Sequence, residues 1–318
     1  MTFATMSGDW VDPAPHESKF VTVNGVRLNY LDWGGQGPWL ILLPGITWSP
    51  HHFDDLAPAF TDHYRVIAYA RRCHGLSEVK WPCDAATITE DLRCLMDALG
   101  IERANLVGHS YGGTELTWMA GLHPRRVERI VYLDGGYDWA DPLWKAAMEA
   151  WPFEMEVPES ARRSLEAYFR YAKAGTDPKT VLGKWFEPVA RESVIVQEDG
   201  TVRPRRDLAD LEHLVRDMLG NPRRDYTKVH CPALAVYASE FFDSAHLLPA
   251  HRKKVREWDT KYLVPFRIES VERIRRELKG VRVETVPTDH AGIVITLTKP
   301  VAKLMRDFLA YSPPLPAH

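Results

Sequence analysis

The pentapeptide Gly108-His109-Ser110-Tyr111-Gly112 is the segment whose residue types and spacing most directly indicate chemistry. The apolar run at residues 104–107 precedes it, and a helix-forming stretch at residues 114–119 follows it. A serine between a buried strand and a helix sits on a tight, strained turn that projects its hydroxyl above the sheet, and the flanking glycines prevent collisions there. The spacing therefore predicts a nucleophilic Ser110 and a collision for any larger residue at either glycine.

A serine hydroxyl needs two further groups to act as a nucleophile. A neutral imidazole has to accept its proton, and a carboxylate has to hold the tautomer of that imidazole. Such a trio supports acyl transfer to water: the serine attacks a carbonyl, the histidine passes the proton to the leaving group, and water releases the acyl group. The elements around Ser110 must supply both partners.

The elements that must position these groups alternate between strands and helices. Residues 20–23 and 26–30 flank Asn24-Gly25 and predict an antiparallel hairpin. Further strands are predicted at residues 39–43, 66–69, 104–107, 130–133, 232–237 and 281–286. Helices are predicted at residues 87–99, where Thr87 and Glu90 would form a capping box, and at about residues 300–309. The alternation predicts an α/β fold with a parallel sheet covered on both faces.

The alternation stops after Asp134. From about residue 137 to residue 226 the sequence is helical in pattern, charged, rich in tryptophan and interrupted by prolines, without strand runs. We interpret this stretch as a helical cap inserted into the core. The predicted organisation is therefore a core formed by residues 1–136 and 227–318, with a cap at residues 137–226.

In this context the pentapeptide resembles the nucleophile turn of the α/β-hydrolase superfamily. Leu42-Leu43-Pro44-Gly45-Ile46 is similar to the family's oxyanion loop, with Pro44 in place of the usual histidine. Residues 70–77 are similar to its D-x-R-G-H-G-x-S segment, with alanine for the aspartate and cysteine for the first glycine. The resemblance runs from Phe20 to the C-terminal helix. It implies a mostly parallel eight-stranded sheet with helices on both faces and an inserted helical cap.

The resemblance also indicates where the base and the acid should lie. The base is expected on a loop after the last strand, where His290 stands. The acid is expected at one of two strand ends. Asp134 ends the strand after the nucleophile helix, whereas Glu240 and Asp243 follow the strand after the cap, with Phe241 at the position expected for aspartate. We favour Asp134 and keep Asp243 and Glu240 as alternatives.

The remaining site predictions concern the oxyanion and the substrate. The backbone N–H groups of Ile46 and Tyr111 are the expected oxyanion donors. Side chains expected to contact substrate are Trp48, His109, Trp139, Trp144 and Trp185. Collectively the aromatic residues of the cap suggest an apolar pocket, while packing of cap on core is the alternative for each one alone.

No metal site and no cofactor are predicted. His51 and His52 are expected to begin a surface helix rather than to bind a substrate or a metal. The sequence has neither the spacing of a metalloprotease helix nor a glycine-rich phosphate loop.

The amino-acid composition limits the classes of molecule that the chain is expected to bind. The chain has 318 residues with 40 basic and 43 acidic side chains, a net charge of −3, so it offers no field to attract nucleic acid or an anionic membrane. The four cysteines form no C-x-x-C pair and are expected to be reduced thiols. The first ten residues show no signal-peptide pattern and no apolar run reaches the ~18 residues of a membrane helix, so a cytoplasmic location is expected.

The predicted activity is hydrolysis of a carboxylic ester or lactone of a hydrophobic small molecule. A serine at the turn separates this chain from the haloalkane dehalogenases and epoxide hydrolases of the superfamily, which attack with an aspartate. Two alternatives remain: hydrolysis of amide or carbon–carbon bonds by the same trio, and a receptor that binds a small molecule with little turnover. No feature of the sequence assigns an oligomeric state.

Overall fold

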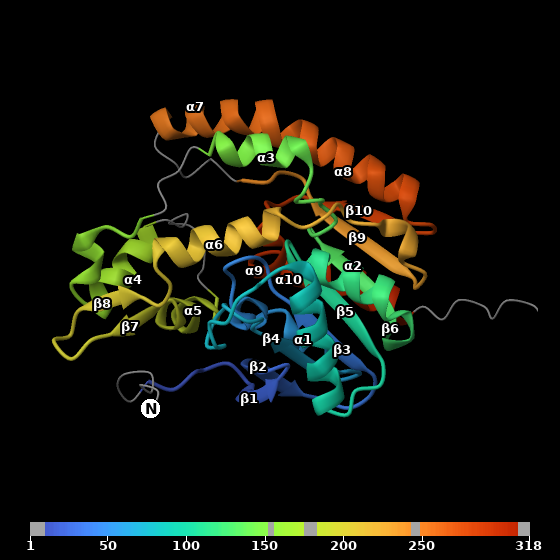
Figure 1. The fold of residues 1–318 in the computed structure, drawn as a ribbon, viewed down its shortest axis with the longest axis horizontal. Coiled ribbons are helices and arrows are strands. Elements are labelled where there is room, and N and C mark those ends of the chain that lie inside the picture. The colour runs from blue at the N-terminus through green and yellow to red at the C-terminus, as the bar shows by residue number, and fades with distance from the viewer. Residues whose placement is uncertain (1–9, 152–155, 175–182, 243–248, 311–318) are drawn as a thin grey trace, which may run out of the picture.

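The computed structural model of the protein describes residues 10–151, 156–174, 183–242 and 249–310. Its centre is an eight-stranded sheet with the order β1-β2-β4-β3-β5-β6-β9-β10 (Figure 1). The strands are β1 (Glu17–Val23), β2 (Val26–Gly34), β3 (Trp39–Leu43), β4 (Arg65–Tyr69), β5 (Ala104–His109), β6 (Val127–Leu133), β9 (Ala233–Ala238) and β10 (Arg282–Val286). The pairings β1–β2 and β2–β4 are antiparallel and all others are parallel. The mostly parallel eight-stranded sheet is confirmed.

The N-terminal hairpin forms where the sequence predicts it. Val23 pairs with Val26 across the two-residue turn Asn24-Gly25. Both turn residues have positive φ, 48° and 69°, the conformation that asparagine and glycine adopt most readily in a tight hairpin. This antiparallel hairpin extends the parallel part of the sheet.

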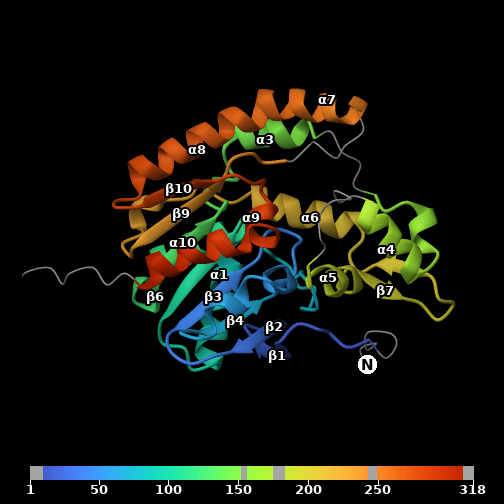
Figure 2. The same ribbon diagram turned by 180° about the vertical axis from the view of Figure 1, so that it is seen from behind.

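Helices cover both faces of the sheet. They are α1 (Ala85–Ala98), α2 (Gly112–Leu122), α7 (Pro249–Trp258), α8 (Val264–Glu277), α9 (Gly292–Ile295), α10 (Thr298–Ala310) and the short turns η1 (Pro50–Phe53), η2 (Ala57–Phe60), η3 (Pro124–Arg126) and η6 (Asp259–Leu263). In β3, Ile41 and Leu43 face the apolar cluster under α1, α2 and α8, whereas Leu40 and Leu42 face the cluster under α10, η1 and η2. Figures 1 and 2 show these two helical layers from opposite sides. Burial on both faces explains the continuous apolar runs.

Helix α1 starts two residues before the predicted position. Its N-cap is Asp84, whose side chain accepts a hydrogen bond from the Thr87 N–H. The capping box predicted for Thr87 and Glu90 is therefore wrong: aspartate caps more strongly than threonine and lies earlier in the chain. The Glu90 carboxylate instead accepts from Arg93 one helical turn later.

The stretch between β6 and β9 is mainly helical but contains a hairpin. Its elements are α3 (Pro142–Glu149), η4 (Glu159–Arg162), α4 (Leu165–Ala174), α5 (Phe186–Glu192), β7 (Val194–Val196), β8 (Val202–Pro204), α6 (Leu208–Leu219) and η5 (Tyr226–Lys228). The absence of strands predicted for this stretch is wrong, since β7 and β8 pair antiparallel. Each strand has three residues, which is too few for a recognisable alternation of apolar and polar residues. The sequence feature that could have predicted this hairpin is the turn Asp199-Gly200, in which Gly200 has a φ of 82°. The domain division stays a prediction.

Among the described residues, no helix combines the length and the apolar character needed to cross a membrane.

Candidate active site

Ser110 occupies a strained turn between β5 and α2. Its φ is 52°, a left-handed value that is uncommon for a residue with a side chain. A Cβ atom added to Gly108 would lie 2.5 Å from the Gly112 backbone, and one added to Gly112 would lie 2.2 Å from the Leu43 carbonyl oxygen. Strand and helix approach so closely that both glycines are required, as predicted.

His290 and Asp134 meet at the carboxyl end of the sheet. The His290 Nδ1 lies 2.6 Å from Asp134 Oδ2, and the Asp134 side chain is fully buried. Asp134 directly follows β6 and His290 follows β10, so two loops far apart in sequence converge here. Of the alternative acids, Glu240 is exposed at the end of β9 and Asp243 lies outside the described residues. The structure thus places Asp134 against the predicted base.

The second oxygen of Asp134 is also occupied. Oδ1 accepts hydrogen bonds from the Tyr137 hydroxyl at 2.6 Å and from the Ala238 N–H at 3.0 Å. Burial and the adjacent carboxylate raise the pKa of Tyr137 well above its ordinary value, which keeps this hydroxyl a donor. The role of Tyr137 was missed in the sequence, where only its closeness to Asp134 could have indicated it. These bonds fix the carboxylate that faces His290.

The predicted oxyanion donors flank Ser110. Tyr111 is the N-cap of α2, and a Cβ atom added to Gly45, the neighbour of Ile46, would lie 3.1 Å from Ser110 Cβ. Within the described part of the chain, neither the Ile46 N–H nor the Tyr111 N–H donates to a protein acceptor. Both amides are therefore available to a ligand oxygen.

Arg71 holds the oxyanion loop from behind. Its guanidinium donates to the carbonyl oxygens of Pro44 at 2.6 Å and Gly45 at 3.0 Å, and it pairs with Glu115 at 3.1 Å. Burial lowers the pKa of Arg71 to about 10, so the side chain stays charged at neutral pH. This residue lies in the segment that resembles D-x-R-G-H-G-x-S, for which the sequence indicated support of the fold but no contact with the oxyanion loop. Arg71 positions the loop that carries Ile46.

Six aromatic rings form an unbroken row of contacts, here called the aromatic stack, in which the two contacts of His109 are tilted and the other three are stacked. Neighbouring ring centroids in the order Trp185, His52, Trp48, His109, His290, Phe241 are 5.4, 3.9, 4.4, 4.7 and 4.2 Å apart. Phe241, at the position where the family has aspartate, lies parallel to the His290 ring, with 12° between the planes. The apolar ring of Phe241 therefore contacts His290 on the side where an acid was the alternative.

Within this stack His109 makes a positioning contact. Its Nε2 lies 2.9 Å from the His290 carbonyl oxygen, and the residue is fully buried. Burial, together with the neighbouring His290, holds the pKa of His109 well below its ordinary value, so the ring is neutral. The observed contact orients the loop that carries His290, and the substrate contact predicted for His109 stays a prediction.

Comparisons with known proteins agree with this architecture. The family model described as alpha/beta hydrolase fold matches residues 38–166. The crystal structure of E-2-(acetamidomethylene)succinate hydrolase superposes with a TM-score of 0.66 over 93% of this chain and 100% of that chain, at 23% identity. The chain has the α/β-hydrolase fold. At this identity the superposition supports the shared fold alone.

Curated relatives of this chain match over shorter segments. The non-heme chloroperoxidase CPO-A1 of Kitasatospora aureofaciens is 38% identical over 104 residues, 32% of this chain and 38% of that protein. The fluoroacetate dehalogenase of a Burkholderia species is 36% identical over 124 residues, 37% of this chain and 40% of that protein. The match thus spans about two fifths of each relative.

The other two tryptophans predicted to contact substrate, Trp139 and Trp144, are buried near Phe241. Trp139 and Trp144 form an edge-to-face pair at 4.6 Å, and Trp144 lies 6.0 Å from Phe241. Both also contact Phe266 of α8. Trp139 joins the loop after β6 to α8, and Trp144 joins α3 to α8, as the packing alternative predicts. Phe241 lies between Trp144 and His290.

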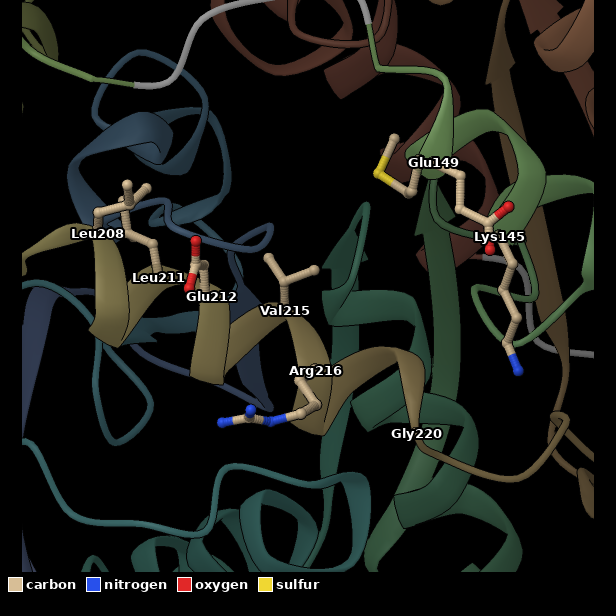
Figure 3. Close-up of a pocket in the computed structure, with 9 residues that line it drawn as sticks. Lys145, Glu149, Leu208, Leu211, Glu212, Val215, Arg216 and Gly220 are labelled. Carbon is tan, nitrogen blue, oxygen red and sulfur yellow. The ribbon is translucent and has the colours of Figure 1, made fainter.

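A cavity of 680 Å³ opens between α3 and α6 (Figure 3). Its lining mixes apolar and charged side chains from α3 (Lys145, Met148, Glu149) and α6 (Leu211, Val215, Arg216). Neither Ser110 nor His290 is among its described lining residues, nor is any of the five residues predicted to contact substrate.

The surface position predicted for His51 and His52 is wrong. Both are buried in η1, with 4% and 6% of their surface exposed, because the oxyanion loop folds back under α5. Burial lowers the pKa of His52 to about 4, which keeps its ring neutral in the aromatic stack. Burial would also lower the pKa of His51, but the carboxylates of Glu192 and Asp54 raise it to about 10. Nothing in the local sequence shows these long-range contacts.

Replacing Tyr137 by phenylalanine is expected to lower kcat about 10–100-fold with little change in KM, because Asp134 loses a hydrogen bond to a charged group. The measurement is steady-state kinetics on an activated ester. Tyr132→Phe is the matched control, since its hydroxyl bonds Thr117 and no site residue. Equal effects of the two substitutions would contradict a positioning role for Tyr137.

Proposed function

We propose that the protein is a serine hydrolase that cleaves a carboxylic ester or lactone of a hydrophobic small molecule. The observation that carries this proposal is the pairing of His290 Nδ1 with buried Asp134, together with the strained turn of Ser110, whose N–H donates to the carbonyl oxygen of Leu133, the residue before Asp134. An Nδ1–H donated to Asp134 leaves Nε2 of His290 to accept a proton.

The reaction proceeds in two stages. Ser110 Oγ attacks the substrate carbonyl while His290 takes its proton, and the resulting oxyanion binds the N–H groups of Ile46 and Tyr111. Asp134 stabilises the imidazolium, which then protonates the leaving alcohol. In the second stage His290 activates water, which hydrolyses the acyl-enzyme and restores Ser110.

The substrate class follows from the leaving group and the surroundings. An alkoxide leaves a tetrahedral intermediate more readily than an amine anion, so the trio suits esters and lactones without further assistance. The Phe241 ring stacks on His290 and supplies apolar surface to the base, and Trp144 and Trp48 extend this aromatic surface through Phe241 and His109. These features favour a small hydrophobic acyl compound as partner, rather than nucleic acid or a membrane.

The test is covalent labelling with a fluorophosphonate, read as intact mass. We expect one adduct on the wild type and none on Ser110→Ala or His290→Ala, because only an activated serine reacts. Ser239→Ala, at an exposed serine after β9, is the control and should label like the wild type. An unlabelled, folded wild type, or labelling that survives Ser110→Ala, would contradict the proposal.

Turnover separates the proposed hydrolase from a receptor. A hydrolase should complete many turnovers of an aryl ester or lactone, and Ser110→Ala should abolish this turnover. A receptor with the same trio would react with about one equivalent and stop.

A further inference from the structure

A second cluster of ionisable side chains lies behind the oxyanion loop. Asp12 and His16 precede β1, whereas His51 belongs to η1 and Asp54 follows it. One ligand atom from each of these four residues lies within 4.8 Å of the other three. The segment that leads into β1 passes below α5 in both ribbon views (Figures 1 and 2). Three distant parts of the chain meet there.

We propose that Asp12, His16, His51 and Asp54 bind one divalent transition-metal cation, of which Zn²⁺ is the expected example. This site is independent of the serine chemistry. Imidazole nitrogen and carboxylate oxygen are ordinary zinc ligands. Two of each, supplied by two segments distant in sequence, form a complete four-coordinate set.

The separations of the ligand atoms suit a tetrahedral ion. His16 Nε2 lies 3.4 Å from Asp12 Oδ2 and 3.2 Å from Asp54 Oδ1. His51 Nδ1 lies 3.5 Å from Asp12 Oδ2 and 3.0 Å from Asp54 Oδ2. Metal–ligand bonds of about 2.0–2.2 Å at tetrahedral angles separate neighbouring ligand atoms by roughly 3.3–3.5 Å. These separations use both oxygens of Asp54. With one oxygen from each carboxylate, the four ligand atoms lie within 4.8 Å of one another, so binding requires Asp54 to turn one oxygen toward the ion and the set to contract around it.

Unpartnered buried atoms point to the same centre. The side chains of His16 and Asp54 are 2% and 0% exposed. Within the described residues, Asp54 Oδ1 and both ring nitrogens of His16 form no hydrogen bond of acceptable geometry, although His16 Nε2 lies 3.2 Å from Asp54 Oδ1. Burying such atoms without partners costs free energy, which coordination of Asp54 Oδ1 and His16 Nε2 would recover.

The carboxylate of Glu192 contacts the ring nitrogen of His51 that points away from the four proposed ligand atoms. Glu192 Oε1, from the end of α5, lies 3.3 Å from His51 Nε2, while the other carboxylate oxygen accepts a hydrogen bond from Ser49 Oγ. Metal-binding histidines commonly donate their second ring nitrogen to a carboxylate in this way. Glu192 is thus placed to orient His51 with Nδ1 toward the ion.

The site would be structural. Four protein ligands leave no open position for a substrate or an activated water. Bound metal would fasten the segment before β1 to η1, five residues beyond Ile46, and through Glu192 to α5. Protons compete for the same nitrogens, so metal binding should release protons. The alternative is a network of protonated histidines and carboxylates that binds no metal.

The experiment is titration of the chelator-treated full chain with Zn²⁺, with bound metal measured after dialysis. We expect one Zn²⁺ per chain, a raised Tm, and a visible Co²⁺ spectrum of tetrahedral type. His16→Gln should weaken Zn²⁺ binding by more than about 100-fold, and Glu192→Gln by about 10–100-fold. His63→Gln is the control, because His63 is an exposed histidine outside the cluster.

Several outcomes would overturn the proposal. These are no stoichiometric Zn²⁺ on the folded wild type, an unchanged Tm, or equal binding by His16→Gln and His63→Gln. Circular dichroism checks the fold of each variant. If His16→Gln does not fold, Asp12→Asn replaces it, because Asp12 is the most exposed ligand and its loss should also weaken binding.

Discussion

Asp134→Asn is expected to lower kcat about 10⁴-fold while leaving the fold intact. An amide of the same shape keeps the side chain in place, but it can donate to His290 Nδ1 and so favours the wrong tautomer of the base. The Asp134 side chain is fully buried and both of its oxygens are occupied, so no other group can take over. The measurement is kcat on an aryl ester that proves to be a substrate.

The other two acids provide the matched controls. Glu240→Gln and Asp243→Asn should retain kcat within a few-fold of the wild type, since neither residue needs to contact His290 in this arrangement. The prediction is wrong if Asp134→Asn keeps near wild-type kcat while either control loses most of its kcat. The acid that pairs with His290 would then be the one that follows β9.

Arg71→Met is expected to destabilise the protein by about 3–5 kcal/mol. The substitution leaves the Glu115 carboxyl and the carbonyls of Pro44 and Gly45 buried without the guanidinium that binds them. Burial raises the pKa of Glu115 above its ordinary value. Without Arg71, stability is therefore retained at acidic pH and falls as pH rises through that folded-state pKa. Urea unfolding at several pH values measures both effects.

Two variants test the cause of that loss. Arg71→Met combined with Glu115→Gln should recover part of the free energy of unfolding and remove most of the added pH dependence. Arg93→Met, which breaks ion pairs on the surface of α1, should cost only about 0–1 kcal/mol. A loss in Arg71→Met no larger than that in Arg93→Met would contradict the role assigned to the buried guanidinium.

Local signals in the sequence predicted most of the core. The turn Asn24-Gly25 and the apolar runs determined the hairpin and the strands, because backbone conformation and burial on both faces leave direct traces in residue type. The glycines around Ser110 likewise predicted the turn, since the observed approach of α2 to β3 admits no side chain at Gly112. Boundaries were less accurate, as at Asp84 and in the short hairpin β7–β8.

The partners of these residues could not be read from local sequence. Three acids were compatible with the pattern, and only the convergence of the loops after β6 and β10 brings Asp134 to His290. Arg71 reaches Pro44 across 27 positions, and His51 reaches Glu192 across more than a hundred. Such pairings depend on which loops the sheet order brings together.

The sequence by itself thus determined the α/β-hydrolase fold, the nucleophile turn and the candidate base, because each is encoded by neighbours in the chain. Only the tertiary structure decided which carboxylate faces His290, that Arg71 and Tyr137 hold the site, and that His16 and His51 share a buried cluster. Hydrogen bonds and ion pairs act over about 3 Å in space, whatever the distance along the chain. The order of the strands, not the spacing of the residues, selects these partners.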